Sequence, residues 1–354
     1  MSIRYGIIGT GMMGCEHIRN ILRIQGADIT AIADINEKSL NWGINACGDK
    51  FSPKIFNNYQ ELLMQDDIDA VVVATPNFSH IDVMREVFKT NKHVLLEKPM
   101  CTSLKDAKEV MESSKTHKGV VWIGLEYRYM TTISAALKNL ESVGNIKMCA
   151  IREHRFPFLK KVEDWNRFNS NTGGTLVEKC CHFFDLMNQV IPSDPVSVFA
   201  SGGQDVNHLD EIYHGKKSDI LDNAYVIVNY ANGARALLDL CMFAEGSKHE
   251  QEIAITGDTG KIEVTIPGKE LIISERSSND FKRIPVDPDL RIKEQGFHHG
   301  ASYLEHLSFL DAINNKTEPE VSIEDGFMSV VLGLAAQQSI ATGQLIKISD
   351  VLKG

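Results

Sequence analysis

The sequence lacks any apolar run of about 18 residues, the length that a membrane-spanning helix needs. It also lacks a cluster of basic residues, since its 37 Lys and Arg stand against 47 Asp and Glu and give a net charge of −10. Duplex nucleic acid and anionic membranes are bound mainly through clustered Lys and Arg, so we expect neither as a partner. The first twenty residues show no signal-peptide pattern.

Cysteine is present, but without the pattern of a disulfide framework. The seven cysteines are odd in number and scattered, which favours a reducing compartment, and we expect a cytoplasmic protein. Metal-ligand residue types adjoin in Cys180-Cys181-His182. Consecutive helical residues point about 100° apart, however, and no second Cys/His cluster stands at ligand spacing. We therefore expect no metal.

The chain is longer than one hydrophobic core usually supports, so two domains are expected. Over residues 1–125, short apolar runs alternate with amphipathic stretches, which predicts an α/β domain with a doubly wound parallel sheet. Its strands are expected at 3–9, 28–34, 69–74, 93–96 and 120–124, and its helices at 12–25, 37–46, 59–65, 80–89 and 104–115.

Residues 126–354 are different, because several of their apolar stretches alternate in period two. This predicts an α+β domain with a large open, mainly antiparallel sheet. Its strands are expected at 146–154, 196–202, 223–230, 234–242, 250–256, 260–266 and 270–274, and its helices at 132–142, 175–190, 302–315 and 323–341. The last helix is a candidate to pack back on the first domain.

A glycine-rich loop, Gly9-Thr10-Gly11-Met12-Met13-Gly14, stands between the first expected strand and the first expected helix. In this G-x-G-x-x-G pattern Gly9 permits the tight turn, Gly11 lets backbone N–H groups approach a pyrophosphate, and Gly14 lets helix and strand pack closely. The phosphates would lie at the positive end of the helix. The loop therefore predicts a dinucleotide cofactor.

A second, independent signal is Asp34, which ends the second expected strand 20 residues after Gly14. An acidic residue at this distance hydrogen-bonds the adenosine ribose, and its charge repels a 2′-phosphate. The cofactor is therefore expected to be NAD rather than NADP. The alternative is an ordinary glycine turn followed by a helix-capping acid.

Thr75, Pro76 and Asn77 follow another strand of this domain, and His80 lies one helical turn further on. The carboxyl ends of strands in such sheets face the ligand crevice, so we expect these four residues to line the nicotinamide side. Alternatively, Pro76 and Asn77 only begin a helix, and His80 is structural.

Two further motifs complete a family pattern with the glycine loop: Glu97-Lys98-Pro99 after a strand, and Gly173-Gly174-Thr175-Leu176 leading into His182 and Asp185. With them, the chain resembles the Gfo/Idh/MocA family of sugar and cyclitol dehydrogenases, typified by glucose-fructose oxidoreductase and myo-inositol dehydrogenase. The resemblance implies a Rossmann domain followed by an α+β domain whose open sheet forms the subunit contact. We thus expect a homo-oligomer, a dimer or tetramer.

The resemblance also implies roles for single residues. Lys98 and His182 would be catalytic, and Glu97 and Arg128 would approach the nicotinamide. Family members usually carry Asp four residues before the histidine, whereas this chain has Glu178. The longer side chain keeps an acceptor there but changes the substrate contact made by it.

The residue types fit alcohol oxidation. Glu178, His182 and Asp185 are spaced i, i+4, i+7, which places them on one face of a single expected helix. Histidine takes a hydroxyl proton near neutral pH, so His182 is the expected general base. Asp185 would orient either His182 or a substrate hydroxyl. Lys98 would stabilise alkoxide character on the same oxygen. The alternatives are a structural histidine, a solvated loop lysine, and a solvated face formed by Glu178 and Lys179.

Substrate contacts are expected from Trp165-Asn166-Arg167 in one polar stretch, above all from Trp165 and Arg167, and from His298-His299 before another helix, above all from His299. Aromatic faces stack on the C–H side of sugars, while Arg and His serve hydroxyl groups. Alternatively, Trp165 anchors a loop and His298-His299 is an exposed helix start.

These inferences together predict an NAD-dependent dehydrogenase that moves a hydride between nicotinamide and a secondary alcohol of a sugar, a cyclitol such as inositol, or a related polyol. One alternative is an epimerase, lyase or glycosidase that retains its NAD through a redox-assisted cycle. Another is a non-catalytic, NAD-binding regulatory protein.

Overall fold

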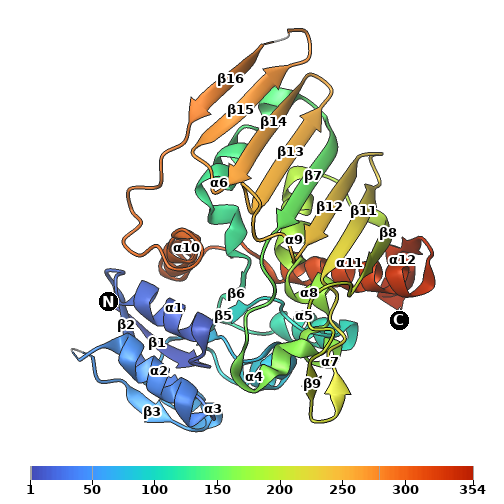
Figure 1. The fold of residues 1–354 in the computed structure, drawn as a ribbon. Helices are drawn as coiled ribbons and strands as arrows, with labels where there is room; N and C mark the ends of the chain where they lie inside the picture. Colours follow the sequence, from blue (N-terminus) through green and yellow to red (C-terminus); the bar gives the residue numbers. More distant parts are fainter. Residues whose placement is uncertain (1, 50, 279, 354) are drawn as a thin grey trace. The chain divides into compact units, whose positions relative to one another are not determined.

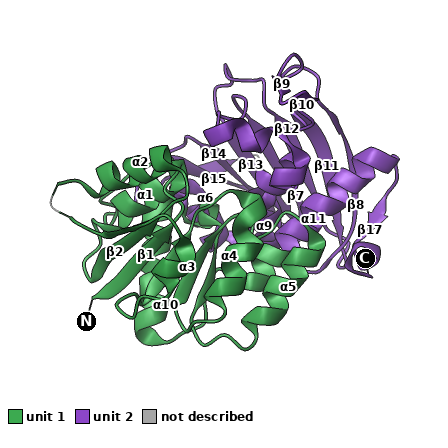
Figure 2. Ribbon diagram, turned by 90° about the horizontal axis from the view of Figure 1, so that it is seen from below, with its two compact units in different colours: residues 1–129, 290–327 green, residues 130–289, 328–354 purple. Residues whose placement is uncertain are grey.

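The computed structural model describes residues 2–49, 51–278 and 280–353 (Figure 1). They form two compact units, coloured separately in Figure 2. Unit 1 comprises Met1–Tyr129 and Leu290–Phe327, and unit 2 comprises Met130–Asp289 and Met328–Gly354. Each unit thus combines two stretches of chain, because the segment from Leu290 folds onto the first unit. The functional boundary near residue 125 stays a prediction.

Unit 1 contains a six-stranded, fully parallel sheet with the order β3-β2-β1-β4-β5-β6. This confirms the predicted doubly wound sheet, and the strand order reverses between β1 and β4. The three-residue β3 was not predicted, because it is too short and too exposed to show a pattern. The strands are β1 (Ile3–Ile8), β2 (Ala27–Ala33), β3 (Lys54–Phe56), β4 (Ala70–Val73), β5 (His93–Glu97) and β6 (Val121–Gly124).

Three helices of unit 1 begin at a residue whose side chain caps the helix. Asn36, Asn58 and Ser103 each accept a hydrogen bond from a backbone N–H in the first turn of the helix that follows. The last helix of the unit, α10, packs on α1 and on the short helix η2. The helices are α1 (Met12–Ile21), α2 (Glu37–Cys47), α3 (Tyr59–Leu63), η1 (Asn77–Ser79), α4 (His80–Val87), α5 (Leu104–Ser114), η2 (Glu126–Tyr129) and α10 (Ala301–Asn315).

Unit 2 contains a nine-stranded sheet with the order β16-β15-β14-β13-β7-β12-β11-β8-β17. Only the β7–β12 pair is parallel among its described pairings, so the predicted open, mainly antiparallel sheet is confirmed. The strands are β7 (Ile146–His154), β8 (Pro195–Gly203), β11 (Asn223–Tyr230), β12 (Arg235–Cys241), β13 (Gln251–Gly257), β14 (Gly260–Ile266), β15 (Glu270–Glu275), β16 (Phe281–Pro285) and β17 (Ile346–Lys347). A separate hairpin pairs β9 (Ile212–Tyr213) with β10 (Lys216–Lys217).

Helices cover one face of this sheet (Figure 1). Helix α6 packs on β14 and β15, α9 on β7, and α12 on β8. The other helices are η3, η4, α7, α8 and α11, and α11 begins in unit 1. Their bounds are α6 (Thr131–Lys138), η3 (Leu140–Val143), η4 (Val162–Arg167), α7 (Asn169–Thr172), α8 (Thr175–Glu178), α9 (Cys181–Val190), α11 (Ile323–Thr342) and α12 (Ile348–Lys353).

Two helix predictions are wrong in part. The helix expected over 132–142 ends at Lys138, and the separate short helix η3 follows it. The single helix expected over 175–190 is two helices, α8 and α9, because Lys179 and Cys180 form a turn between them. Among the described helices, none combines the length and apolar character needed to cross a bilayer. All seven cysteines are free thiols.

Candidate cofactor and active site

The glycine loop lies between β1 and α1 in unit 1. Gly9 has φ +91°, and a Cβ on it would lie 2.6 Å from the carbonyl carbon of Ala74. A Cβ on Gly14 would lie 2.0 Å from the Gly9 carbonyl oxygen, whereas a Cβ on Gly11 would meet nothing within 4 Å. Gly9 and Gly14 are thus needed for close packing, and Gly11 leaves open space at the N-terminus of α1. This arrangement fits a dinucleotide pyrophosphate.

Asp34 follows β2 and is bound to the glycine loop. Its Oδ2 accepts a hydrogen bond from the Thr10 backbone N–H at 2.8 Å, and its Oδ1 accepts one from the Asn36 N–H at 2.8 Å. The buried Thr10 hydroxyl donates to the Ser39 carbonyl oxygen. A carboxylate has further acceptor sites, so Asp34 keeps the capacity to accept ribose hydroxyl groups.

The loop after β4 carries Thr75, Pro76 and Asn77. Asn77 begins η1, and its side-chain nitrogen is buried without a hydrogen-bond partner among the described residues. His80 is fully buried, with Nδ1 2.9 Å from the Pro99 carbonyl oxygen and Nε2 3.0 Å from the Thr75 carbonyl oxygen. Burial lowers the pKa of His80 despite these two carbonyl groups. His80 therefore joins the loop after β4 to the loop after β5.

Glu97 ends β5 and is buried, immediately before Lys98. Its Oε1 lies 2.7 Å from His17 Nε2, and its Oε2 accepts a hydrogen bond from the Lys98 backbone N–H at 3.1 Å. Burial opposes ionisation, but the hydrogen bond with His17 and the charge of Lys98 outweigh it and hold the pKa of Glu97 well below its usual value. Glu97 is therefore a buried carboxylate that fixes the backbone next to Lys98.

Arg128 lies in η2 and is almost fully buried in unit 1. Its Nη1 donates to the Glu320 carbonyl oxygen at 2.9 Å, and its Nη2 lies 3.1 Å from Asp325 Oδ1. These contacts hold the guanidinium within the unit. Its expected approach to nicotinamide stays a prediction.

His298 and His299 precede α10 and belong to unit 1. His298 lies between two buried carboxylates, with one ring nitrogen 3.4 Å from Glu16 and the other 3.4 Å from Glu126. Burial lowers the pKa of His298, but the two carboxylates outweigh it, so the pKa is raised. His299 is exposed, with φ +53°. Its contact with substrate stays a prediction.

In unit 2, Glu178 ends α8, and His182 and Asp185 lie in α9. All three side chains are buried. The neighbouring Lys179 is buried too, with Nζ 2.8 Å from Oε1 of the fully buried Glu153 on β7. The alternative of a solvated face formed by Glu178 and Lys179 is therefore wrong. Several buried ionisable groups in one segment are typical of a functional site, and the catalytic roles of Glu178, His182 and Asp185 stay predictions.

Trp165 and Arg167 lie in η4 of unit 2. Trp165 is half-buried, and its carbonyl oxygen accepts a hydrogen bond from the Asn171 side chain. Arg167 is buried, with Nε 3.1 Å from Glu211 and Nη2 3.3 Å from the Phe158 carbonyl oxygen. These contacts order the loop, and the substrate contacts of both residues stay predictions.

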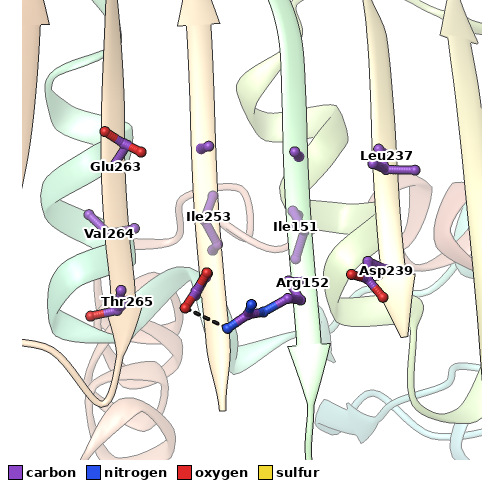
Figure 3. Close-up of a pocket in the computed structure, with 11 residues that line it drawn as sticks. Ile151, Arg152, Leu237, Asp239, Ile253, Glu263, Val264 and Thr265 are labelled. Carbon is purple, nitrogen blue, oxygen red and sulfur yellow. Dashed lines mark ion pairs between the residues drawn. The ribbon is translucent and has the colours of Figure 1, made fainter. Parts of the chain in front are cut away.

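The outer face of the nine-stranded sheet holds a shallow depression over β12, β7, β13 and β14 (Figure 3). Its rim combines Leu237 with charged side chains, and Arg152 forms an ion pair with Glu252 at 2.5 Å. No expected site residue lines it. The described part of the chain holds no group of three or more His, Cys, Asp or Glu placed to bind a metal ion.

Sequence reasoning missed a set of buried polar residues in unit 1: Glu16, His17, Glu305 and His306. The available signal was position, because Glu16 and His17 directly follow the glycine loop on α1. Glu305 and His306 lie in a helix of low amphipathicity, so the pattern of α10 could not separate a buried glutamate from a surface one.

Most of the chain matches one oxidoreductase family. The family model described as "Oxidoreductase family, NAD-binding Rossmann fold" matches residues 3–125, and the one described as "Oxidoreductase family, C-terminal alpha/beta domain" matches residues 138–348. The myo-inositol 2-dehydrogenase of Thermotoga maritima is 26% identical over 354 residues, covering 99% of this chain and 100% of the relative. The inositol 2-dehydrogenase of Salmonella typhimurium is 24% identical, covering 97% and 96%.

Solved structures show the same fold. Levoglucosan dehydrogenase in complex with NADH and levoglucosan has a TM-score of 0.84 at 18% identity, covering 98% of this chain and 100% of its own. An Agrobacterium radiobacter oxidoreductase in complex with NAD+, L-tartaric acid and magnesium also has a TM-score of 0.84, at 20% identity, covering 99% and 100%. At these identities the likeness establishes the fold alone.

Proposed function

Because this chain belongs to the Gfo/Idh/MocA family of NAD-binding oxidoreductases, we propose that it oxidises a secondary alcohol of a cyclitol, sugar or related polyol. The relatives named inositol 2-dehydrogenase support an inositol-like substrate. The observation that carries the proposal lies within unit 1. The glycine loop, the Asn77 turn and Lys98 follow β1, β4 and β5, which are neighbours in a parallel sheet, so all three stand at one edge. The ends of β1 and β5 are about 10 Å apart at usual strand spacing.

The cofactor fits this edge. The Gly11 N–H and the start of α1 would hold the pyrophosphate, Asp34 the adenosine ribose, and the loop with Thr75 and Asn77 the nicotinamide side. When bound, NAD supplies the acceptor for a hydride from carbon. The chain's own residues have the remaining task, which is to bind the alcohol and to handle its proton.

His182 and Lys98 handle that proton in our proposal. His182 takes the hydroxyl proton as the carbon–hydrogen bond breaks, and the Lys98 ammonium donates a hydrogen bond to the oxygen as negative charge develops on it. Glu178 accepts a hydrogen bond from a substrate hydroxyl, and Asp185 orients His182. The burial of all three groups of unit 2 supports this assignment.

Separate Lys98→Ala and His182→Ala variants test it. We expect each to lose at least about 100-fold in kcat for NAD reduction with inositols, the low end for loss of an acid–base group, and to keep the Kd for NAD. Turnover at the wild-type level in both variants, with unchanged NAD binding, would refute the assignment. Product formed without release of NADH would favour a redox-assisted cycle, and NAD binding without turnover of any polyol would favour a regulatory protein.

Asp34→Ser tests the cofactor preference. Removing the charge beside the ribose relieves the repulsion of a 2′-phosphate, so we expect the kcat/KM ratio of NAD to NADP to fall by about 10-fold or more, equivalent to at least 1.4 kcal/mol. A wild-type enzyme that prefers NADP would remove the role given to Asp34.

We also propose that a second copy of the chain covers the outer face of the nine-stranded sheet. Phe199, Ile227, Leu237 and Ala150 lie opposite one another across four strands, and Phe199, Ile227 and Leu237 are exposed. Two residues further along these strands, the side chains that lie opposite one another are charged and of both signs: Asp239, Arg152 and Glu252. Such a face complements a two-fold copy of itself, as an isologous contact requires.

Light scattering after size exclusion tests this contact. We expect Leu237→Arg to lower the oligomer mass, whereas Met64→Arg, a matched change at an exposed site on unit 1, leaves it unchanged. A monomeric wild-type protein at micromolar concentration would contradict the proposal. The seven free thiols agree with the reducing, cytoplasmic compartment that we propose for the protein.

A further inference from the structure

A row of three buried side chains leads through unit 1 to the end of β5. His306 Nε2 on α10 lies 2.8 Å from His17 Nδ1 on α1, and His17 Nε2 lies 2.7 Å from Glu97 Oε1. The two imidazoles are fully buried, and Glu97 is 5% exposed. No step of the proposed reaction uses His17 or His306.

The hydrogen-bond geometry favours one arrangement of protons. With Glu97 ionised, His17 donates from Nε2 and accepts at Nδ1, so the proton between the rings belongs to His306 Nε2. His306 Nδ1 is then a bare acceptor, which agrees with its having no hydrogen-bond partner among the residues that the structure describes. The reverse arrangement would place an N–H at that buried position, which is the more costly mismatch. Burial keeps the pKa of His306 well below its usual value, so the ring is neutral.

The row ends at the backbone of Lys98. Glu97 Oε2 accepts the Lys98 N–H, and on the other side of Lys98 the Pro99 carbonyl oxygen contacts His80. The peptide group that precedes Lys98 and the carbonyl group of the next residue, Pro99, are therefore both held by buried side chains. The titratable groups that face the row from the elements around it are Glu16, His80, Lys98, Glu126, His298 and Glu305.

We infer that His17 and His306 are positioning residues for Lys98, because they hold Glu97 in the one orientation that fixes the lysine backbone. This inference rests on the proposed role of Lys98 in proton handling. His306 differs in this from an ordinary core residue, because only a side chain with an N–H donor at the position of Nε2 can hydrogen-bond to His17 Nδ1 and complete the row.

Three variants test the inference. His306→Phe keeps an aromatic ring against Tyr5, whose centroid lies 6.4 Å from that of His306, but removes the donor. His306→Gln restores an N–H near the position of Nε2. His117→Phe is the control, because His117 is a half-buried histidine of unit 1 that also packs on an aromatic ring, Phe88, but lies outside the row.

We expect His306→Phe to lower kcat by about 10- to 100-fold, the usual effect of losing a partner that orients a functional group. The pH profile of kcat/KM should shift as well, while the Kd for NAD stays within about twofold of wild type. His306→Gln should recover most of the lost kcat, and His117→Phe should keep the wild-type pH profile.

Nitrogen-15 NMR of the histidine rings gives a readout independent of activity. We expect His17 to be protonated at Nε2 and bare at Nδ1 in the wild-type protein, and a proton on Nδ1 would overturn the inference. So would a His306→Phe enzyme that melts earlier but keeps the wild-type kcat and pH profile. If Lys98→Ala were fully active, the proposed function itself would fail, whereas a normal His306→Phe enzyme that still needs Lys98 would refute this inference alone.

Discussion

The two sheets of this protein use their surfaces in different ways. In unit 1, strands β4 and β6 are buried at every position, as is the second half of β1, so neither face of the sheet is available to a ligand. In unit 2, β11, β12 and β14 alternate between buried and less buried positions, and one face stays open. A sheet covered on both faces can bind a ligand only where its strands end. The open sheet, in contrast, leaves a whole face available to another protein.

The covered sides of the two sheets also differ in the charges they contain. The inner face of the nine-stranded sheet holds the ion pair of Glu153 and Lys179, and both residues are buried. The six-stranded sheet is covered by α10, whose Glu305 accepts a hydrogen bond from the Trp122 indole of β6 at 3.2 Å. The covered face of the nine-stranded sheet thus buries a pair of opposite charges. The covered face of the six-stranded sheet buries a carboxyl group that is held by a neutral donor.

The largest effect is expected when the buried ion pair is broken. Glu153→Leu removes the carboxylate that Lys179 pairs with, and we expect a loss of about 3–5 kcal/mol in the free energy of unfolding. Glu153→Leu combined with Lys179→Met should recover most of this loss, because the buried ammonium is then gone, and Arg155, which also contacts Glu153, keeps Glu250 as a partner. Urea unfolding followed by circular dichroism checks both, and a double variant as unstable as the single one would contradict this account.

A neighbouring pair of leucines on β12 sharpens the contrast between covered and open faces. Leu238 is fully buried, whereas Leu237 is 37% exposed. Leu238→Ala leaves a cavity, so we expect a loss of about 2–5 kcal/mol. Leu237→Ala should cost less than about 1 kcal/mol in a monomer, so a larger loss that grows with protein concentration would locate the subunit contact on this face. Equal losses at low concentration would show that the two faces are covered alike.

Much of this fold could be predicted from the sequence, because the spacing of apolar residues along a strand shows whether one face or both faces of its sheet are covered. Continuous apolar runs gave β4 and β6, and alternation gave β11 and β14 at their observed bounds. The break at Lys179 and Cys180 could not be predicted, since both residues keep helical dihedral angles and only the hydrogen bonds change. Short exposed elements such as β3 and β16 carry no pattern at all.

The candidate site was predictable where a backbone shape or a motif demands a residue type, as at Gly9, Gly14 and Asp34. The histidine row was not predictable, because it joins residues 289 positions apart in the chain, His17 and His306. Neither residue belongs to a motif that sequence reasoning singled out, and only the packing of α10 on α1 brings them together.

The smallest expected effect concerns Glu305 on α10, the helix that covers the six-stranded sheet. Its variant tests how the stability of this unit depends on pH. Burial raises the pKa of Glu305 well above its model-compound value of 4.5. The folded protein therefore binds this proton more tightly than the unfolded chain does, so the contribution of Glu305 to stability is full below about pH 4.5 and declines as the pH rises toward the folded pKa. Glu305→Gln has no proton to lose and can still accept the Trp122 hydrogen bond.

The Tm of Glu305→Gln, relative to wild type, should therefore increase from pH 5 to pH 8. Glu97 has the opposite shift, to a pKa of about 2, so it stays ionised between pH 5 and pH 8 and does not titrate within this comparison. Glu324→Gln, at an exposed position at the start of α11, is the matched control and should follow wild type throughout. Parallel Tm curves for Glu305→Gln and wild type would mean that Glu305 titrates as it does in the unfolded chain. The carboxyl group over the covered sheet would then be no different from one in water.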